Sequence, residues 1–204
     1  MAQVHNSSVS NIVPPRDECL YTKCYCEENV WKLCDHIQQH STDELQRVYA
    51  VFISNQDRVI PLWKQKAARQ PGQPVLWDYH VILLYNQPAG SDIYDLDTVL
   101  PFPVSFREYV ERTIGSNERL KEQFHRFFRV VPAASFLKMF ASDRSHMRKE
   151  NGEWQSPPPT YPCIVAQDGT QMNLDSYISM ELGTGPGEVM TLQQFWSKFS
   201  ASVG

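Results

Sequence analysis

Cys26 stands where a cysteine could act as a nucleophile. It falls at or just before the first turn of a helix expected to begin near Tyr25. The unpaired N–H groups of a first turn carry partial positive charge, which favours a thiolate and could also hold an oxyanion. A thiolate suits covalent catalysis. The alternative is a small buried apolar side chain, which is the commoner fate of a free cysteine.

A base and an orienting carboxylate for this nucleophile follow on two strand-like runs. Residues 75–85 and 93–100 are rich in β-branched and aromatic residues, and a turn-rich segment joins them. In an antiparallel hairpin, directly opposed residues share a face with Cβ atoms about 4.5–5.5 Å apart. Such a hairpin predicts that His80 lies beside Asp95, as a base and the group that sets its tautomer.

The pairing of His80 with Asp95 depends on the hairpin register. It requires Leu84 opposite Ser91, and a slip of one residue would separate the pair. Asp97 is the second candidate for the orienting carboxylate, although in this register it faces Asp78, an unfavourable pair of like charges. A solvated surface pair is the alternative interpretation of the histidine and the aspartate.

Several elements must position these residues. Val48–Ser54 and Val59–Trp63 resemble short strands, and some runs are apolar on both faces, which indicates a sheet covered by helices. The fold class is therefore α+β, with a central, mainly antiparallel sheet. Thr191 and Gln194 form a capping-box pattern at the start of a last helix. Further helices are expected from apolar stripes at 30–37, 106–110, 120–128 and 136–140.

The domain organisation is simple. Residues 1–15 are expected to form a flexible N-terminal lead-in, and residues 16–204 a single catalytic domain. The proline-rich segment 156–162 is expected to be an extended surface linker. Only about 40 residues follow it, and a segment that short rarely folds alone.

Composition and motifs exclude several functions. The chain has 204 residues, 42% of them hydrophobic, and a net charge of -4, so no basic surface for nucleic acid is expected. No apolar run could span a membrane and no secretory signal is visible, which predicts a cytoplasmic and nuclear protein. His36 and His40 share a helix face but lack a metal motif. The sequence cluster of Cys19, Cys24, Cys26, Cys34 and His36 fits no zinc pattern. Neither a metal nor a cofactor is expected, and His125 and His146 are expected on the surface.

Longer segments carry a resemblance to a known family. They cover nearly the whole chain from Pro14 to the late 190s, with departures in the first dozen residues, the last few and the loop 67–74. The segments are PPRDECLY, CYCEENVWKLC, YAVFISN, IPLWKQ, WDYHVILL, IYDLDTVLPFP, FASDRSHM, PPPTYPC and MNLDSYISM. Through them the chain closely resembles the protein N-terminal glutamine amidohydrolase family of the N-degron pathway.

This resemblance implies a function and a fold. Such enzymes convert an N-terminal glutamine of a protein or peptide to glutamate, and they are monomers with an α-β-α sandwich of the transglutaminase and papain type. The family's nucleophile falls on Cys26, its base on His80 and its acid on Asp95. The expected partners are then proteins or peptides with a free N-terminal glutamine. Their side chain is expected to form a thioester intermediate with the thiol.

Substrate binding needs further groups. A free α-ammonium leaving water must meet a carboxylate or several carbonyls, and Glu27, Asp78 and Asp143 are candidates. Tyr25 and Trp77 could wall a slot for the glutamine side chain. The backbone N–H of the nucleophile and the Trp77 indole, or another amide, could hold the oxyanion.

Two other functions stay open from the sequence. One is a transglutaminase- or protease-like cysteine enzyme that uses the same triad. The other is a non-catalytic module that binds N-termini through a degenerate pocket. Products formed from a peptide with N-terminal glutamine would distinguish them.

Overall fold

The computed structural model describes residues 12–200, and these residues form a mixed α/β structure. The strands are β1 (Val48–Ser54), β2 (Ile60–Leu62), β3 (Val75–Trp77), β4 (His80–Gln87), β5 (Gly90–Tyr94), β6 (Val104–Ser105), β7 (Phe127–Pro132) and β8 (Glu188–Thr191). The α-helices are α1 (Cys26–His40), α2 (Phe106–Tyr109), α3 (Ala133–Met139), α4 (Leu174–Ile178) and α5 (Leu192–Phe199). Short 3-10 helices are η1 (Arg16–Glu18), η2 (Thr42–Arg47), η4 (Glu122–Phe124) and η5 (Ser145–Met147), and η3 (Val110–Ile114) is a short π-helix.

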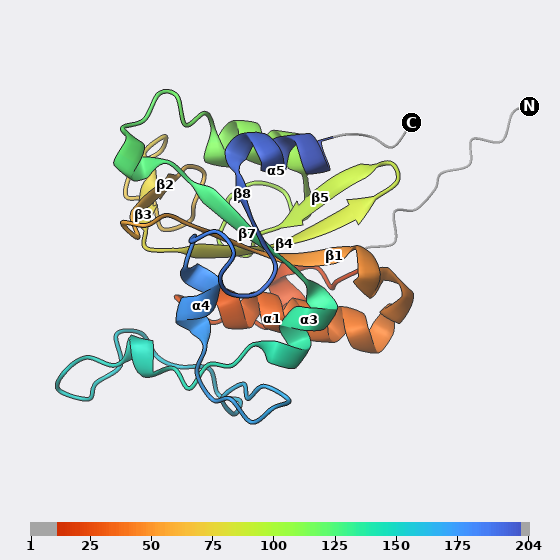
Figure 1. Ribbon diagram of the computed structural model, residues 1–204, viewed down its shortest axis with the longest axis vertical. Helices are drawn as coiled ribbons and strands as arrows, with labels where there is room; N and C mark the ends of the chain where they lie inside the picture. The colour runs from red at the N-terminus through yellow and green to blue at the C-terminus, as the bar shows by residue number, and fades with distance from the viewer. Residues whose placement is uncertain (1–11, 201–204) are drawn as a thin grey trace, which may run out of the picture.

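The strands make one central sheet and one small one. The central sheet has six strands in the order β6-β5-β4-β1-β7-β8, and each neighbouring pair is antiparallel. Strands β2 and β3 pair separately. Figure 1 shows α1, α3 and α4 on one side of the central sheet and α5 on the other. The predicted α+β class with a mainly antiparallel sheet is therefore confirmed.

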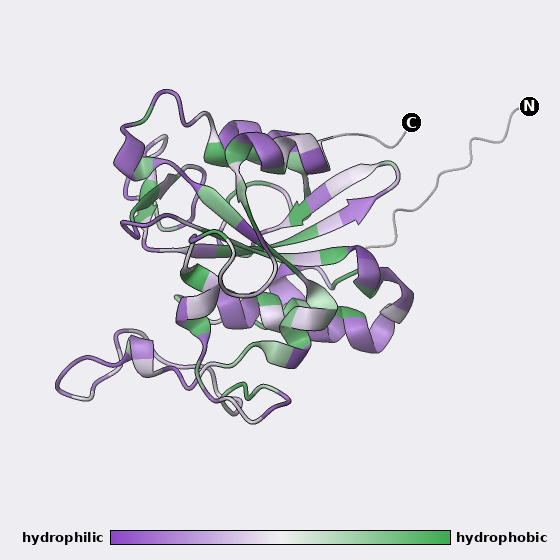
Figure 2. Ribbon diagram, viewed as in Figure 1, coloured by the Kyte–Doolittle hydropathy of each residue, from purple (hydrophilic) through white to green (hydrophobic). Residues whose placement is uncertain are grey.

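The two faces of the central sheet bury two separate apolar clusters. Alternate side chains of a strand point to opposite faces, so Ala50 and Phe52 of β1 pack with α1 and α3. Val51 and Ile53 of the same strand pack with α2 and α5. Figure 2 shows the hydrophobic residues concentrated along the central strands, with hydrophilic residues over the outer turns. Helices on both faces explain why these strands are apolar on both sides.

Several elements appear as the sequence predicts. Strand β1 has the predicted bounds, Val48–Ser54. Helix α5 begins with a complete capping box, because the Thr191 hydroxyl accepts from the Gln194 N–H and the Gln194 side chain accepts from the Thr191 N–H. Cys34 is fully buried in α1, as expected for the apolar stripe of that helix.

Other predicted elements were wrong. The stripe at 120–128 predicted a helix, but β7 begins at Phe127 and pairs with β1, because its alternating side chains fill both cores. The run 75–85 is broken at Asp78 and Tyr79 into β3 and β4, which belong to different sheets. The strand predicted at 93–100 ends at Tyr94, where the chain leaves the sheet.

Most of the expected lead-in at 1–15 lies outside the described residues, while Ile12 and Val13 are buried against the core of α1. Among residues 12–200, no helix has both the length and the apolar character needed to cross a bilayer.

Candidate active site

Cys26 is the first residue of α1, as the sequence predicts. Tyr25 precedes it in a non-helical conformation, with φ -128° and ψ 49°, and its side chain does not cap the helix. The preceding turn is held by Asn29, whose side-chain amide exchanges two hydrogen bonds of 2.8 and 2.9 Å with the Thr22 backbone. The first N–H groups of α1 are therefore not satisfied by a side-chain cap and stay available to an anion.

The resting state of the Cys26 thiol differs from the expectation. Burial raises its pKa well above the ordinary value, and the Glu27 carboxylate raises it further, while the backbone N–H of Val81 opposes them. Desolvation thus opposes the effect of the positive helix end and favours the neutral thiol. A neutral thiol that attacks a carbonyl must lose its proton to a nearby base. Val81 directly follows His80, which places the thiol at the start of β4.

His80 and Asp95 form a fully buried pair. The His80 Nε2 lies 3.0 Å from Asp95 Oδ1, and both side chains are inaccessible to solvent. Burial acts to lower the pKa of His80, but the Asp95 carboxylate overcomes it and the pKa is raised. Burial acts to raise the pKa of Asp95, but the His80 charge and hydrogen bond overcome it and the pKa is lowered. The pair thus stabilises an imidazolium next to a carboxylate.

Further donors hold Asp95 in place. The Tyr109 hydroxyl donates to Oδ2 at 2.8 Å, and the Gln65 side-chain amide donates to the same oxygen at 3.2 Å. The backbone N–H of Asp97 donates to Oδ1 at 2.8 Å. The sequence interpretation missed Gln65 and Tyr109, although the segment IPLWKQ, which contains Gln65, belongs to the family resemblance.

The second nitrogen of the imidazole is free. His80 Nδ1 is buried and has no hydrogen-bond partner in the part of the chain that the structure describes. The Trp77 ring is stacked over the His80 ring, with centroids 5.4 Å apart and planes 20° apart. The indole therefore covers one face of the imidazole and keeps water from the histidine–aspartate pair. A base held by a carboxylate through Nε2 has Nδ1 left to exchange a proton.

The hairpin register predicted from sequence was wrong by two residues. Leu84 pairs with Ile93 and not with Ser91, because the connection between β4 and β5 is a short turn closed by the pair Gln87 and Gly90. Asp95 lies beyond the last pair, and its carboxylate reaches His80 because the chain turns after β5. A shift of two residues keeps the same face, so the histidine and the aspartate still meet.

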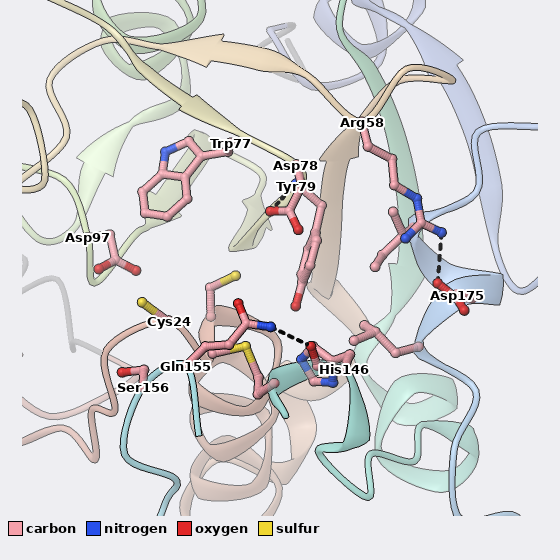
Figure 3. A pocket seen from close by; sticks show the side chains of 14 residues that line it. Cys24, Arg58, Trp77, Asp78, Tyr79, Asp97, His146, Gln155, Ser156 and Asp175 are labelled. Carbon is pink, nitrogen blue, oxygen red and sulfur yellow. Dashed lines mark hydrogen bonds and ion pairs between the residues drawn. The ribbon is translucent and has the colours of Figure 1, made fainter. Parts of the chain in front are cut away.

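A pocket of about 400 Å³ opens beside these groups. Figure 3 shows Trp77, Asp78 and Tyr79 along one side, Gln155, Ser156 and His146 along the opposite side, and Arg58 paired with Asp175 at one end. The lining residues are Cys24, Cys26, Arg58, Trp77, Asp78, Tyr79, Asp97, His146, Met147, Gln155, Ser156, Leu174, Asp175 and Ile178.

Two of the predicted substrate-binding residues, Trp77 and Asp78, line this pocket. The Trp77 indole nitrogen is buried and has no hydrogen-bond partner among the described residues, and in Figure 3 it is turned away from Cys24 and Gln155. Asp78 is exposed, and one of its oxygens accepts from the Tyr79 N–H.

The other three predicted substrate-binding residues do not line this pocket. They are Tyr25, Glu27 and Asp143. Tyr25 is fully buried, and its hydroxyl donates to the Ser156 carbonyl at 3.1 Å. Asp143 is exposed, and its carboxylate accepts from the Ser145 N–H. Glu27 is buried directly behind the wall. These positions reflect tertiary packing that sequence spacing does not reveal.

His146 was expected on the surface, yet it lines the pocket. Its Nε2 lies 3.6 Å from Glu27 Oε1. His125 is half-buried, and its ring nitrogen lies 3.2 Å from the Leu120 carbonyl. The segment FASDRSHM places His146 within the family resemblance, which was the available signal for its role.

One group of side chains has the spacing of a metal site. Ligand atoms of His80, Asp95 and Asp97 lie within 4.8 Å of one another. The hydrogen bonds to Asp95 already account for both of its oxygens, and Asp97 accepts from the Tyr21 hydroxyl at 2.6 Å. The donors of the protein therefore explain this cluster without an ion.

Comparison with known proteins assigns the family. The family model described as N-terminal glutamine amidase matches residues 21–199. The chain belongs to the N-terminal glutamine amidase family. It is 54% identical over 190 residues to the protein N-terminal glutamine amidohydrolase of Bos taurus, covering 92% of this chain and 90% of that protein. The proteins of that name from Homo sapiens and Danio rerio are also similar. The Homo sapiens protein is 52% identical, and the match covers 98% of this chain and 96% of that protein. The Danio rerio protein is 49% identical, and the match covers 95% of this chain and 96% of that protein.

Within this amidase family member, the candidate site joins three features. They are a thiol at an uncapped helix start, a buried imidazole with one free nitrogen, and a carboxylate that orients the imidazole. Such a set is suited to acyl transfer through a covalent intermediate.

Proposed function

We propose that this protein deamidates the side chain of an N-terminal glutamine, with Cys26 as nucleophile, His80 as base and Asp95 as its orienting acid. The names of its relatives support the reaction. The observation that carries the assignment of residues is the buried imidazole, held by Asp95 through Nε2 and free at Nδ1. The Cys26 thiol lies next to the following residue, Val81.

The reaction begins with proton transfer. His80 Nδ1 takes the thiol proton as the sulfur attacks the carboxamide carbon, and Asp95 stabilises the imidazolium. The uncapped N–H groups at the start of α1 hold the oxyanion. The imidazolium then protonates the leaving nitrogen, ammonia departs, and a thioester remains.

Hydrolysis completes the cycle. His80 removes a proton from water, which attacks the thioester carbon. The sulfur leaves and recovers its proton from the imidazolium, which gives a glutamate side chain and the original thiol. The roles of base and acid are thus carried by one histidine, and the reaction consumes only water.

We also propose that the sandwich is of the transglutaminase and papain type. Support comes from the order of elements, because the nucleophile opens a helix on one sheet face. The base and the acid follow on and just beyond two adjacent antiparallel strands, β4 and β5. Chain order and geometry of this kind recur on that fold, which is an argument by analogy.

A peptide series that differs only in its first residue tests the proposed function by mass spectrometry. We expect the wild-type protein to convert N-terminal glutamine to glutamate without cleaving the peptide. Asparagine should not react, because its shorter side chain leaves the carboxamide away from the thiol. Cys26→Ala should abolish the reaction, while Cys163→Ala, an exposed cysteine outside the pocket, should leave it intact.

The same assay distinguishes the competing functions. Cleavage of the peptide, or its cross-linking to an added amine, would favour a protease- or transglutaminase-like enzyme. Binding of the peptide with no product, or full activity in Cys26→Ala, would contradict the proposed chemistry.

A further inference from the structure

Behind the pocket wall lies a carboxylate with an unused oxygen. Glu27 is fully buried, and its Oε2 accepts from the Tyr79 hydroxyl at 3.0 Å. Its Oε1 is buried and has no hydrogen-bond partner among the described residues. Leaving such an oxygen unsatisfied is costly, so a native carboxylate of this kind calls for a ligand or another explanation.

His146 stands beside this oxygen and is also unsatisfied. Its Nε2 lies 3.6 Å from Glu27 Oε1, an ion-pair distance for a protonated ring but longer than a hydrogen bond, and within residues 12–200 neither ring nitrogen has a hydrogen-bond partner. His146 lines the pocket, together with Tyr79 and Cys26. Thus Cys26, Tyr79 and His146 of the pocket wall surround the buried Glu27 carboxylate. The carboxylate oxygen Oε1 and the His146 imidazole lack hydrogen bonds and lie side by side.

The distance from the nucleophile fits the substrate. In glutamine, four bonds of about 1.5 Å separate the α-nitrogen from the carboxamide carbon, so the two atoms are at most roughly 5 Å apart. That carbon must bond to Cys26 Sγ, and Sγ lies 3.7 Å from Glu27 Oε2. An α-ammonium attached to a reacting carboxamide therefore falls within reach of the Glu27 and His146 region.

We propose that Glu27 and His146 form the subsite that binds the free α-ammonium group of the substrate. This inference rests on the proposed function and names the residues that select for an N-terminal position. The ammonium group offers three N–H donors. From the side of the pocket, one N–H would donate to Glu27 Oε1 and another to the neutral imidazole, and the buried negative charge would compensate for the lost hydration.

The other carboxylates of the pocket are less suited to this role. Asp97 accepts from the Tyr21 hydroxyl at 2.6 Å, and Asp175 pairs with Arg58 at 2.7 Å. Asp78 is exposed, so water screens its charge. Glu27 is the carboxylate that is both buried and in contact with the nucleophile.

The test compares two substrates within each variant. One is a peptide with N-terminal glutamine, and the other is the same peptide with hydrogen in place of the α-ammonium. Wild type should prefer the first by about 100-fold or more in kcat/KM, since an unpaired buried carboxylate rejects the second. In Glu27→Gln and His146→Asn this preference should fall by at least about tenfold. Any effect of a substitution on the nucleophile cancels in the ratio.

The matched controls are Asp78→Asn, for a pocket carboxylate, and Asp143→Asn, for an exposed carboxylate three residues before His146. Both should keep the wild-type preference, and thermal unfolding should show that all variants are folded. An unchanged preference in Glu27→Gln, or its loss in Asp78→Asn, would overturn the proposed subsite.

A binding measurement keeps the two proposals separate. By calorimetry, wild type should bind a peptide with N-terminal glutamate more tightly than its acetylated form, and Glu27→Gln should lose this difference. If wild type shows the difference but deamidates no peptide, the proposed function fails while the subsite stands. If wild type binds both forms equally, the subsite is refuted whatever the activity.

Discussion

At the scale of single residues, burial and mutual attraction have opposite effects on the pKa values of His80 and Asp95. Burial by itself lowers the pKa of an imidazole and raises that of a carboxyl group. Their mutual attraction reverses both shifts. A base with a raised pKa receives the proton of a thiol more readily, which matters because burial raises the pKa of Cys26.

The substitution Asp95→Asn tests this balance. Without the Asp95 carboxylate, burial is opposed only by the more weakly acting charges of Asp97 and Glu27, so the pKa of His80 should fall from its raised value. Titration of the histidine ring by NMR measures it. Asp97→Asn should change this pKa less, because Asp97 raises it through its charge alone, whereas Asp95 also accepts a hydrogen bond from the ring. A His80 pKa that stays raised in Asp95→Asn would contradict this explanation.

The same pair predicts a pH dependence of stability. Since the folded pKa of His80 is raised, its contribution is complete below the unfolded value and is lost as pH rises through the folded pKa. Since the folded pKa of Asp95 is lowered, its contribution is present above 3.8 and is lost as pH falls through the folded pKa. The difference in unfolding free energy between wild type and Asp95→Asn should therefore be largest between these limits. Urea unfolding at several pH values measures it.

At the scale of elements, helix α5 depends on its first residues. The helix is short, spanning Leu192–Phe199, so its start is a large part of it. Phe195 and Phe199 are buried against the sheet, and the Phe195 ring is stacked on Phe128 of β7 with centroids 4.3 Å apart. The capping box sets where this helix begins and hence where both aromatic rings lie.

Loss of the Thr191 hydroxyl should weaken the helix without touching the site. Thr191→Ala removes the acceptor for the Gln194 N–H and should cost about 1 kcal/mol of unfolding free energy. Thr191→Ser keeps the acceptor and should cost much less. Chemical denaturation measures both values, and the activity at saturating substrate should be unchanged. Equal stability of the alanine and serine variants would show that the cap contributes nothing.

At the scale of the whole molecule, Arg144 connects parts of the chain that are far apart in sequence. Its guanidinium donates to both oxygens of Glu28 in α1, at 2.9 and 2.8 Å. It also donates to carbonyls of the proline-rich segment, at Pro159, Tyr161 and Pro162. The segment predicted to be an extended surface linker is therefore tied to the helix that carries Cys26.

Breaking this connection should be strongly destabilising. Arg144→Ala leaves the Glu28 carboxylate buried without its partner, and we expect a loss of about 3–5 kcal/mol. Arg148→Ala is the matched control, because that exposed arginine stacks on Trp154 and should cost less than about 1 kcal/mol. Thermal and urea unfolding provide both values. Similar losses for the two arginines would refute the role of the buried ion pair.

Much of this protein could be predicted from local pattern. The start of α1 at Cys26, the bounds of β1 and the capping box at Thr191 all follow from interactions within a few residues of chain. Helix caps and strand alternation are local properties, so the sequence alone determines them. The helix expected at 120–128 failed because its aromatic spacing fits a helix, while pairing with β1 favours a strand.

Tertiary structure determined which side chains of distant segments are in contact. The register of β4 and β5, the turn that carries Asp95 to His80, and the donors Gln65 and Tyr109 depend on contacts between distant segments. The burial of Glu27 beside His146 has the same origin. Sequence spacing determines residue types and the faces they share, but only the packed chain determines which groups lose water. Burial and partner together set the pKa and the reactivity of a group, so the chemistry of the site was decided at that level.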